Sequence, residues 1–240
     1  MSRTLLLIVV LHGLLAASPV QAHYLWVTID RADGEHGIAN IYFEESPSVG
    51  DGHYLDPFVQ AKTTWIRTVK QISPQLIETS EQTAGEKQRW LSAPLPAAAP
   101  RSIESYGKFG VYRYGKTDVL LHYYARYLDV TAHEDLHELA RAEQMMLDIV
   151  PHDVGDKLEL KVLWHGEPAV GRPVFVRGPK RFRVNLETNE RGIVRFPVKD
   201  RGRYLFRTNV EEDKAGVDGD KEYSSIRHHA TLIMTLPLQE

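Results

Sequence analysis

The sequence predicts a mostly β protein built as two packed β-sandwich-like domains with one short helix. Apolar and polar residues alternate with a period of two in short runs between residues 24 and 236, a pattern typical of half-buried strands. Turn-forming residues separate these runs, and only one stretch has the spacing of an amphipathic helix. The 240 residues include no cysteine, so a disulfide framework and thiolate metal ligands are both excluded.

Residues 1–22 have the pattern of a secretory signal peptide. Arg3 precedes an apolar stretch over residues 5–15, and the segment ends in small residues that suit cleavage after Ala22. Cleavage there predicts a periplasmic or otherwise exported protein whose mature chain begins at His23. No later stretch approaches the roughly 20 apolar residues that a membrane-spanning helix needs, so we expect no span after removal of the leader.

The N-terminal domain, residues 23–151, is expected to contain two β-hairpins. Alternation over Tyr24–Ile29 and Ile38–Glu44 predicts the first hairpin, and the stretches 106–112 and 117–127 predict the second. On the second strand of the later hairpin, one face carries Val119, Leu121, Tyr123 and Ala125, and the other carries Leu120, His122, Tyr124 and Arg126. Between the hairpins we expect a Gly/Pro/Asp-rich loop at 46–57, strands near 63–72 and 75–80, and a Pro/Ala connection at 93–100.

A single helix is predicted over Thr131–Gln144. Thr131 and Glu134 have the spacing of a capping box, and Leu136, Leu139 and Ala140 form an apolar stripe. A strand near residues 146–150 should then end the N-terminal domain.

The C-terminal domain, residues 152–240, consists of short strands and turns, which predict an Ig-like sandwich with Greek-key connections. The expected strands are 158–164, 174–177, 183–187, 193–198, 203–210 and 226–236.

The charge balance gives no sign of a nucleic-acid partner. The chain has 29 Lys and Arg against 32 Asp and Glu, a formal charge of −3, and its basic residues do not form a long run. We therefore expect no nucleic acid among its partners.

Several short motifs resemble a bacterial domain-of-unknown-function family that was formerly described as a nickel-uptake substrate-specific component. The resemblance implies an exported β protein that handles nickel or cobalt, with a membrane transporter component as a partner. Residues 162–171, 188–192 and 202–204 also look like sandwich modules related to carboxypeptidase regulatory domains, which specifies fold and not activity. The family resemblance rests on AHYLW at 22–26, YFE at 42–44, YGKFGVY at 106–112, LHYYA at 121–125, DIVP at 148–151 and HHATL at 228–232.

The leading functional hypothesis is a transition-metal site built on the mature N terminus. An N-terminal His23 would offer an α-amine and an imidazole on one residue, and His228, His122 or His53 would add further imidazoles. Neutral imidazoles suit Ni, Co, Cu and Zn. His228 is preferred because it shares an apolar strand face, whereas His229 points the other way; the alternative is that His228 is a hydrogen-bonded core histidine.

Two other functions stay open. The segment His133-Glu134-Asp135-Leu136-His137 matches H-E-x-x-H, the pattern of a zinc-dependent hydrolase. Glu143 could add a third ligand only if the helix continues that far. The other alternative is a non-catalytic recognition or adhesion module that binds its ligand through aromatic residues such as Trp65 or Trp90.

Overall fold

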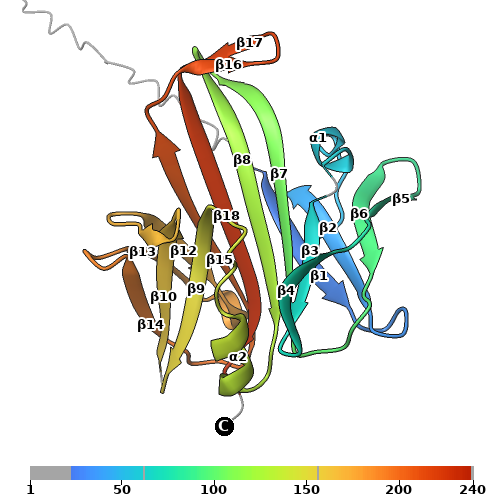
Figure 1. Ribbon diagram of the computed structural model, residues 1–240, viewed down its shortest axis with the longest axis vertical. Helices are drawn as coiled ribbons and strands as arrows, with labels where there is room; N and C mark the ends of the chain where they lie inside the picture. The colour runs from blue at the N-terminus through green and yellow to red at the C-terminus, as the bar shows by residue number, and fades with distance from the viewer. Residues whose placement is uncertain (1–22, 62, 156, 239–240) are drawn as a thin grey trace, which may run out of the picture.

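A computed structural model describes residues 23–61, 63–155 and 157–238 (Figure 1). The mostly β class is confirmed, because strands dominate the chain and only short helical segments interrupt them. The predicted signal peptide, residues 1–22, lies outside the described residues. Within the described residues, no helix is long and apolar enough to cross a membrane.

An eight-stranded sheet forms the centre of the molecule and takes strands from both halves of the chain. Its two halves join where β18 pairs in parallel with β8, in a register that sets His228 beside His122. In order, its strands are β13 (Arg183–Glu187), β12 (Pro173–Arg177), β15 (Gly202–Glu212), β18 (Ser225–Leu236), β8 (Thr117–Asp129), β7 (Arg101–Tyr114), β3 (Thr64–Thr68) and β4 (Gln71–Leu76).

Two smaller sheets lie on either side of the central sheet (Figure 1). The N-terminal one, drawn in blue and teal, has the order β1 (Tyr24–Asp30), β2 (Ile38–Glu44), β6 (Gln88–Pro94) and β5 (Ser80–Ala84). The C-terminal one contains β9 (Leu147–Val154), β10 (Lys157–Trp164), β11 (Glu167–Pro168) and β14 (Ile193–Pro197). The remaining elements are α1 (Asp56–Val59), α2 (His133–Leu139), a 3₁₀ turn at Pro179–Arg181, and a hairpin of β16 (Gly216–Asp218) and β17 (Lys221–Tyr223).

Alternation along the central strands produces a hydrophobic core on each face. On β8, Tyr123 packs into the core beneath the N-terminal sheet, and its neighbour Tyr124 packs into the core beneath the C-terminal sheet. On β18, His229 contacts Tyr24 of β1, whereas His228 contacts Trp164 of β10. The sandwich packing expected from the sequence therefore occurs twice, around one shared sheet.

The predicted domain boundary between residues 151 and 152 falls inside β9. This strand pairs with β10 from Leu147 to Val154 without a break. The division into residues 23–151 and 152–240 stays a prediction.

The predicted helix is shorter than expected, and its predicted capping box is wrong. Helix α2 covers only His133–Leu139, and its N-cap is Ala132, without a side-chain hydrogen bond. The chain leaves the helix because buried groups capture its end: Arg126 donates to the Ala140 carbonyl at 2.6 Å, and Asp148 accepts from the Ala142 amide at 2.8 Å.

Candidate functional site

Two of the four predicted metal ligands, His122 and His228, lie side by side on the face of the central sheet that meets β10. Their rings stack with centroids 4.8 Å apart and planes 11° from parallel. His122 Nδ1 is 2.9 Å from the Tyr106 hydroxyl, and His228 Nδ1 is 3.2 Å from the Tyr124 hydroxyl. His228 Nε2 is also 3.0 Å from Glu212 Oε1, so both of its ring nitrogens have hydrogen-bonding partners.

The environment of this stack keeps both imidazoles neutral. Burial lowers the pKa of His122 to about 4, and the neighbouring His228 adds to the effect. Burial also lowers the pKa of His228, against the opposing influence of Glu212. Neutral rings suit metal binding, but the lone pairs of two parallel rings run side by side and do not converge on one point. A shared ion would require one ring to rotate.

The other two predicted ligands, His23 and His53, lie on the N-terminal side of the central sheet. The His23 ring is 5.3 Å from the Tyr54 ring, and His53 lies 4.5 Å from the same tyrosine. His23 Nε2 is 3.7 Å from Glu44 Oε2. The structure does not bring His23 together with His228, because the two side chains lie on opposite sides of the sheet.

Within the described part of the chain, no group of three or more His, Asp or Glu residues is arranged to hold a metal ion. On α2, His133 and His137 are both exposed, one turn apart. Glu143 lies beyond the end of that helix, so the condition under which it would be a third ligand is not met.

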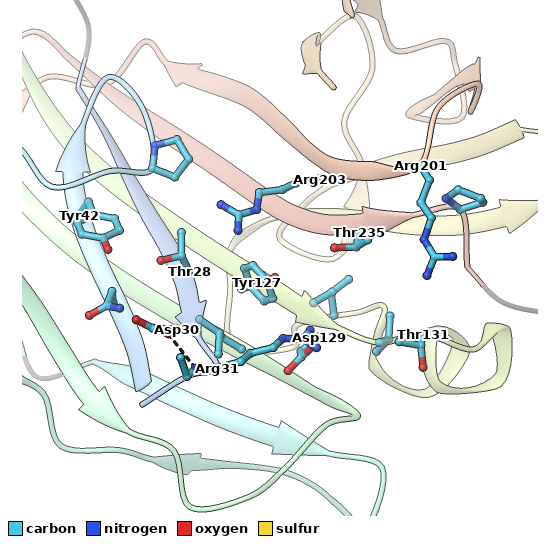
Figure 2. Close-up of a pocket in the computed structure, with 17 residues that line it drawn as sticks. Thr28, Asp30, Arg31, Tyr42, Tyr127, Asp129, Thr131, Arg201, Arg203 and Thr235 are labelled. Carbon is cyan, nitrogen blue, oxygen red and sulfur yellow. Dashed lines mark hydrogen bonds and ion pairs between the residues drawn. The ribbon is translucent and has the colours of Figure 1, made fainter. Parts of the chain in front are cut away.

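A cavity of about 720 Å³ opens at the end of the molecule where β1, β8, β15 and β18 meet (Figure 2). Arg203 extends into it from β15 beside Thr28 and Tyr42 of the N-terminal sheet, and Arg201, just before β15, lies nearer Thr235 and Thr131 (Figure 2). The cavity is lined mainly by polar side chains: Thr28, Asp30, Arg31, Asn40, Tyr42, Tyr127, Asp129, Thr131, Arg201, Arg203 and Thr235.

The floor of this cavity is held by a buried carboxylate. Asp129 is 2 % exposed and pairs with two arginines, Arg31 and Arg101. Arg101 also donates to the His36 carbonyl at 2.8 Å, which ties the loop after β1 to the central sheet. The shape of the cavity is therefore fixed by charge-assisted hydrogen bonds before any ligand arrives.

A second cavity, of about 460 Å³, lies on the face of the N-terminal sheet that points away from its core. Trp90 lines this cavity, and its indole N–H donates a 3.0 Å hydrogen bond to Asn40 Oδ1. Gln82 and Ser92 line the same surface. The two cavities share Asp30, Asn40 and Tyr42, so they adjoin over β1 and β2 and together outline a groove. We call it the polar groove.

Comparison with known proteins does not assign the chain to a family. No protein-family model and no curated protein matches it. One solved structure with some likeness is titled "Biofilm associated protein - BSP domain"; it has 10% sequence identity and a TM-score of 0.21, and the match covers 87% of this chain. The chain spans about half of that protein, 51% of its length. A TM-score that low implies neither a shared fold nor a shared function.

Most residues of the polar groove were missed by the sequence analysis, which named only Trp90. Asn40, Tyr42 and Arg203 lie at alternate positions of ordinary strands. That alternation assigns each residue to one face of a sheet, but it does not show which face carries a cavity. The sequence signal that could have indicated the groove is a polar residue at every second position of a strand together with an aromatic residue.

Proposed function

We propose that the protein is a non-catalytic recognition module that binds an oligosaccharide in the polar groove. The observation that carries the proposal is that the two cavities adjoin over β1 and β2. A groove of that form suits an extended ligand, whereas a small metabolite would use a single enclosed pocket.

The groups that line the groove match the chemistry of sugars. Each sugar unit offers hydroxyls that both donate and accept hydrogen bonds, together with a flat C–H face. Asn40, Gln82 and Thr28 supply amide and hydroxyl partners, and Trp90 supplies an aromatic surface whose orientation is held by its hydrogen bond to Asn40. Because these side chains project from paired strands, little conformational entropy is lost when the ligand binds.

The proposal also places the protein outside the cytoplasm, in agreement with the predicted signal peptide. Polysaccharides of the cell surface and the surrounding medium would be the accessible ligands there.

An oligosaccharide array tests this function, with the secreted protein as probe and calorimetry on the best neutral hit. Trp90→Ala should weaken binding at least about tenfold, which equals about 1.4 kcal/mol. Trp65→Ala is the matched control, since Trp65 is also partly buried but lies on β3, outside the groove. An array without hits, or equal losses in both variants, would overturn the proposal.

Metal capture is a second and separate proposal, now limited to the N-terminal side of the central sheet. The contact between His23 and Glu44, with His53 across Tyr54, favours it. An ion of Ni, Co, Cu or Zn would be held by the His23 amine and imidazole with the Glu44 carboxylate. His122→Ala should leave the affinity unchanged, and one residue added before His23 in the mature protein should abolish it. Titration of the secreted protein with each metal, followed by native mass spectrometry, measures both.

A further inference from the structure

We propose that the face of β13, β12 and β15 opposite the C-terminal core is an anion-binding surface that adjoins the polar groove and selects an acidic polysaccharide. This inference rests on the proposed oligosaccharide function and adds the chemical class of the ligand. We call the surface the arginine face; it consists of Arg177, Arg183, Arg201, Arg203 and Arg207.

Strand register brings these arginines together although they are spread over the sequence. Arg177 on β12 pairs with Arg183 on β13, and Arg207 on β15 pairs with Phe175 on β12. The alternate residues of the same strands, Val174, Val176, Tyr204 and Phe206, are buried in the C-terminal core. Period-two alternation therefore directs the arginines to the opposite face. The N-terminal sheet packs mainly on β8, β18 and β7, and it reaches this face only at β15, where Leu205 packs against its core and Arg207 lies over Tyr24.

The cations of this surface have no acidic partners. Within the described residues, the side chains of Arg177, Arg183, Arg201 and Arg203 form no ion pair, and all four are exposed. Elsewhere on the surface, arginines such as Arg113 pair with a neighbouring carboxylate. Like charges held close together repel one another, and a bound anion relieves that repulsion.

The guanidinium of Arg207 is held in place by two aromatic rings. Its guanidinium lies 4.3 Å from the centroid of the Tyr24 ring and 5.4 Å from that of Phe175. Burial lowers the pKa of Arg207, and the neighbouring Arg177 adds to the effect. Stacking on two aromatic rings holds the planar fork of donors in place, and that fork suits carboxylate and sulfate oxygens.

A hollow of about 340 Å³ lies at this point and is lined by Phe175, Arg177, Arg183, Asn185 and Arg207. Arg203, on the same face of β15 four residues earlier, lines the polar groove. A strand rises about 3.3 Å per residue, so the two arginines are roughly 13 Å apart along β15. Arg203 therefore lies at the groove and Arg207 at the hollow, with the apolar Leu205 between them on the same face of β15.

An acidic polysaccharide fits this arrangement better than a nucleic acid. The cations lead into a groove that offers an indole, amides and hydroxyls, which suit sugar units. Asp30 and Asp33 in the same groove repel the anionic groups of either polymer, so the preference rests on the indole, amides and hydroxyls.

Dextran sulfate and dextran make a matched pair of probes, because they share one backbone and differ in charge. The full secreted chain should bind dextran sulfate, with an affinity that falls as salt rises, and should bind dextran at least about tenfold more weakly. The triple variant Arg177→Gln, Arg183→Gln, Arg203→Gln should lose about tenfold or more toward dextran sulfate. The control Lys87→Gln, Lys116→Gln, Lys157→Gln removes the same charge from other exposed positions and should lose less than about twofold.

The inference fails if the lysine control loses as much as the arginine triple, or if dextran binds as well as dextran sulfate. It also fails if a DNA duplex at equal charge concentration binds more tightly than dextran sulfate. Trp90→Ala separates this result from the proposed function. If that variant keeps all binding to neutral oligosaccharides while the arginine triple loses dextran sulfate, the groove proposal fails and the anion surface stands alone.

Discussion

The central sheet carries two sets of arginines that differ in the partners around them. Beneath the small sheets and α2, Arg67 pairs with Glu104 at 2.7 Å, and Arg126 pairs with Asp148 at 3.0 Å. On the uncovered face of the same sheet, Arg177 and Arg183 have no such partner among the described residues. The charge of a buried arginine side chain must be neutralised within the fold. An arginine on an uncovered face stays free to bind an external anion.

The buried set also explains how α2 is attached. Arg67 donates to the Leu139 carbonyl at 3.2 Å, and Arg126 donates to the carbonyls of Ala140 at 2.6 Å and Ile149 at 2.7 Å. Burial raises the pKa of the Asp148 carboxyl, and Arg126 beside it acts against that rise. These arginines satisfy carbonyls at the end of the helix that would otherwise be buried without a donor.

The sharpest test of the contrast is Arg126→Met. The change leaves the Asp148 carboxylate buried without a cation and removes the donor from two carbonyls. We expect a loss of about 3–5 kcal/mol in the free energy of unfolding. Urea denaturation followed by tryptophan fluorescence measures it.

Arg113→Met is the control, since Arg113 pairs with Asp118 on the same sheet and has a 71 % exposed side chain. Its expected loss is much smaller than that of Arg126→Met, because a solvent-exposed ion pair contributes little to stability. Similar losses of stability in Arg126→Met and Arg113→Met would show that burial does not decide whether an arginine of this sheet stabilises the fold.

The elements that the sequence predicted correctly are those set by local alternation. On β8, Tyr123 and Tyr124 face different cores, as the period-two pattern implies. The prediction of α2 was too long because it used only local signals, a capping-box spacing and an apolar stripe. The helix is ended by Arg126 and Asp148, which come from β8 and β9. Contacts between distant segments cannot be derived from local periodicity.

The arginine face was missed for the same reason. Residues 177–183 contain four basic residues and residues 199–203 contain three, but the local sequence does not show which of their side chains share a face with Arg207. Strand pairing brings Arg177, Arg183 and Arg207 together, and that pairing is a contact between distant segments. The metal hypothesis was limited in a similar way, since pattern alone could not show that His23 and His228 lie on opposite sides of one sheet.

A fall in pH tests the same contrast with a histidine, because protonation of His229 would place a cation in the core without an acidic partner. His229 is 7 % exposed, and its Nδ1 has no hydrogen-bond partner among the described residues. Burial lowers the pKa of His229 to about 3, and Arg227 and His228 add to the effect. An unfolded histidine has a pKa of about 6.5, so the unfolded chain takes up the proton first as the pH falls.

The stability contributed by neutral His229 is therefore complete above about pH 6.5 and is lost as the pH falls toward about 3. Between pH 7 and pH 5 we expect a loss of about 2 kcal/mol from this residue, at about 1.4 kcal/mol per pH unit below the unfolded pKa. Urea titrations at a series of pH values, on the native protein and on His229→Phe, provide the measurement. Parallel profiles for the two proteins would argue against a buried neutral His229.

The smallest effect is expected on the uncovered face, for Arg177→Gln with Arg183→Gln. Neither side chain forms an ion pair within the described residues, and both are exposed, so no buried group loses a partner. Removing two neighbouring like charges should change the free energy of unfolding by no more than about 0.5 kcal/mol, in the stabilising direction. Urea denaturation at low salt, where repulsion is least screened, gives the clearest reading. A loss above about 1 kcal/mol would mean that these arginines stabilise the fold, and the distinction between structural and ligand-binding arginines in this sheet would no longer hold.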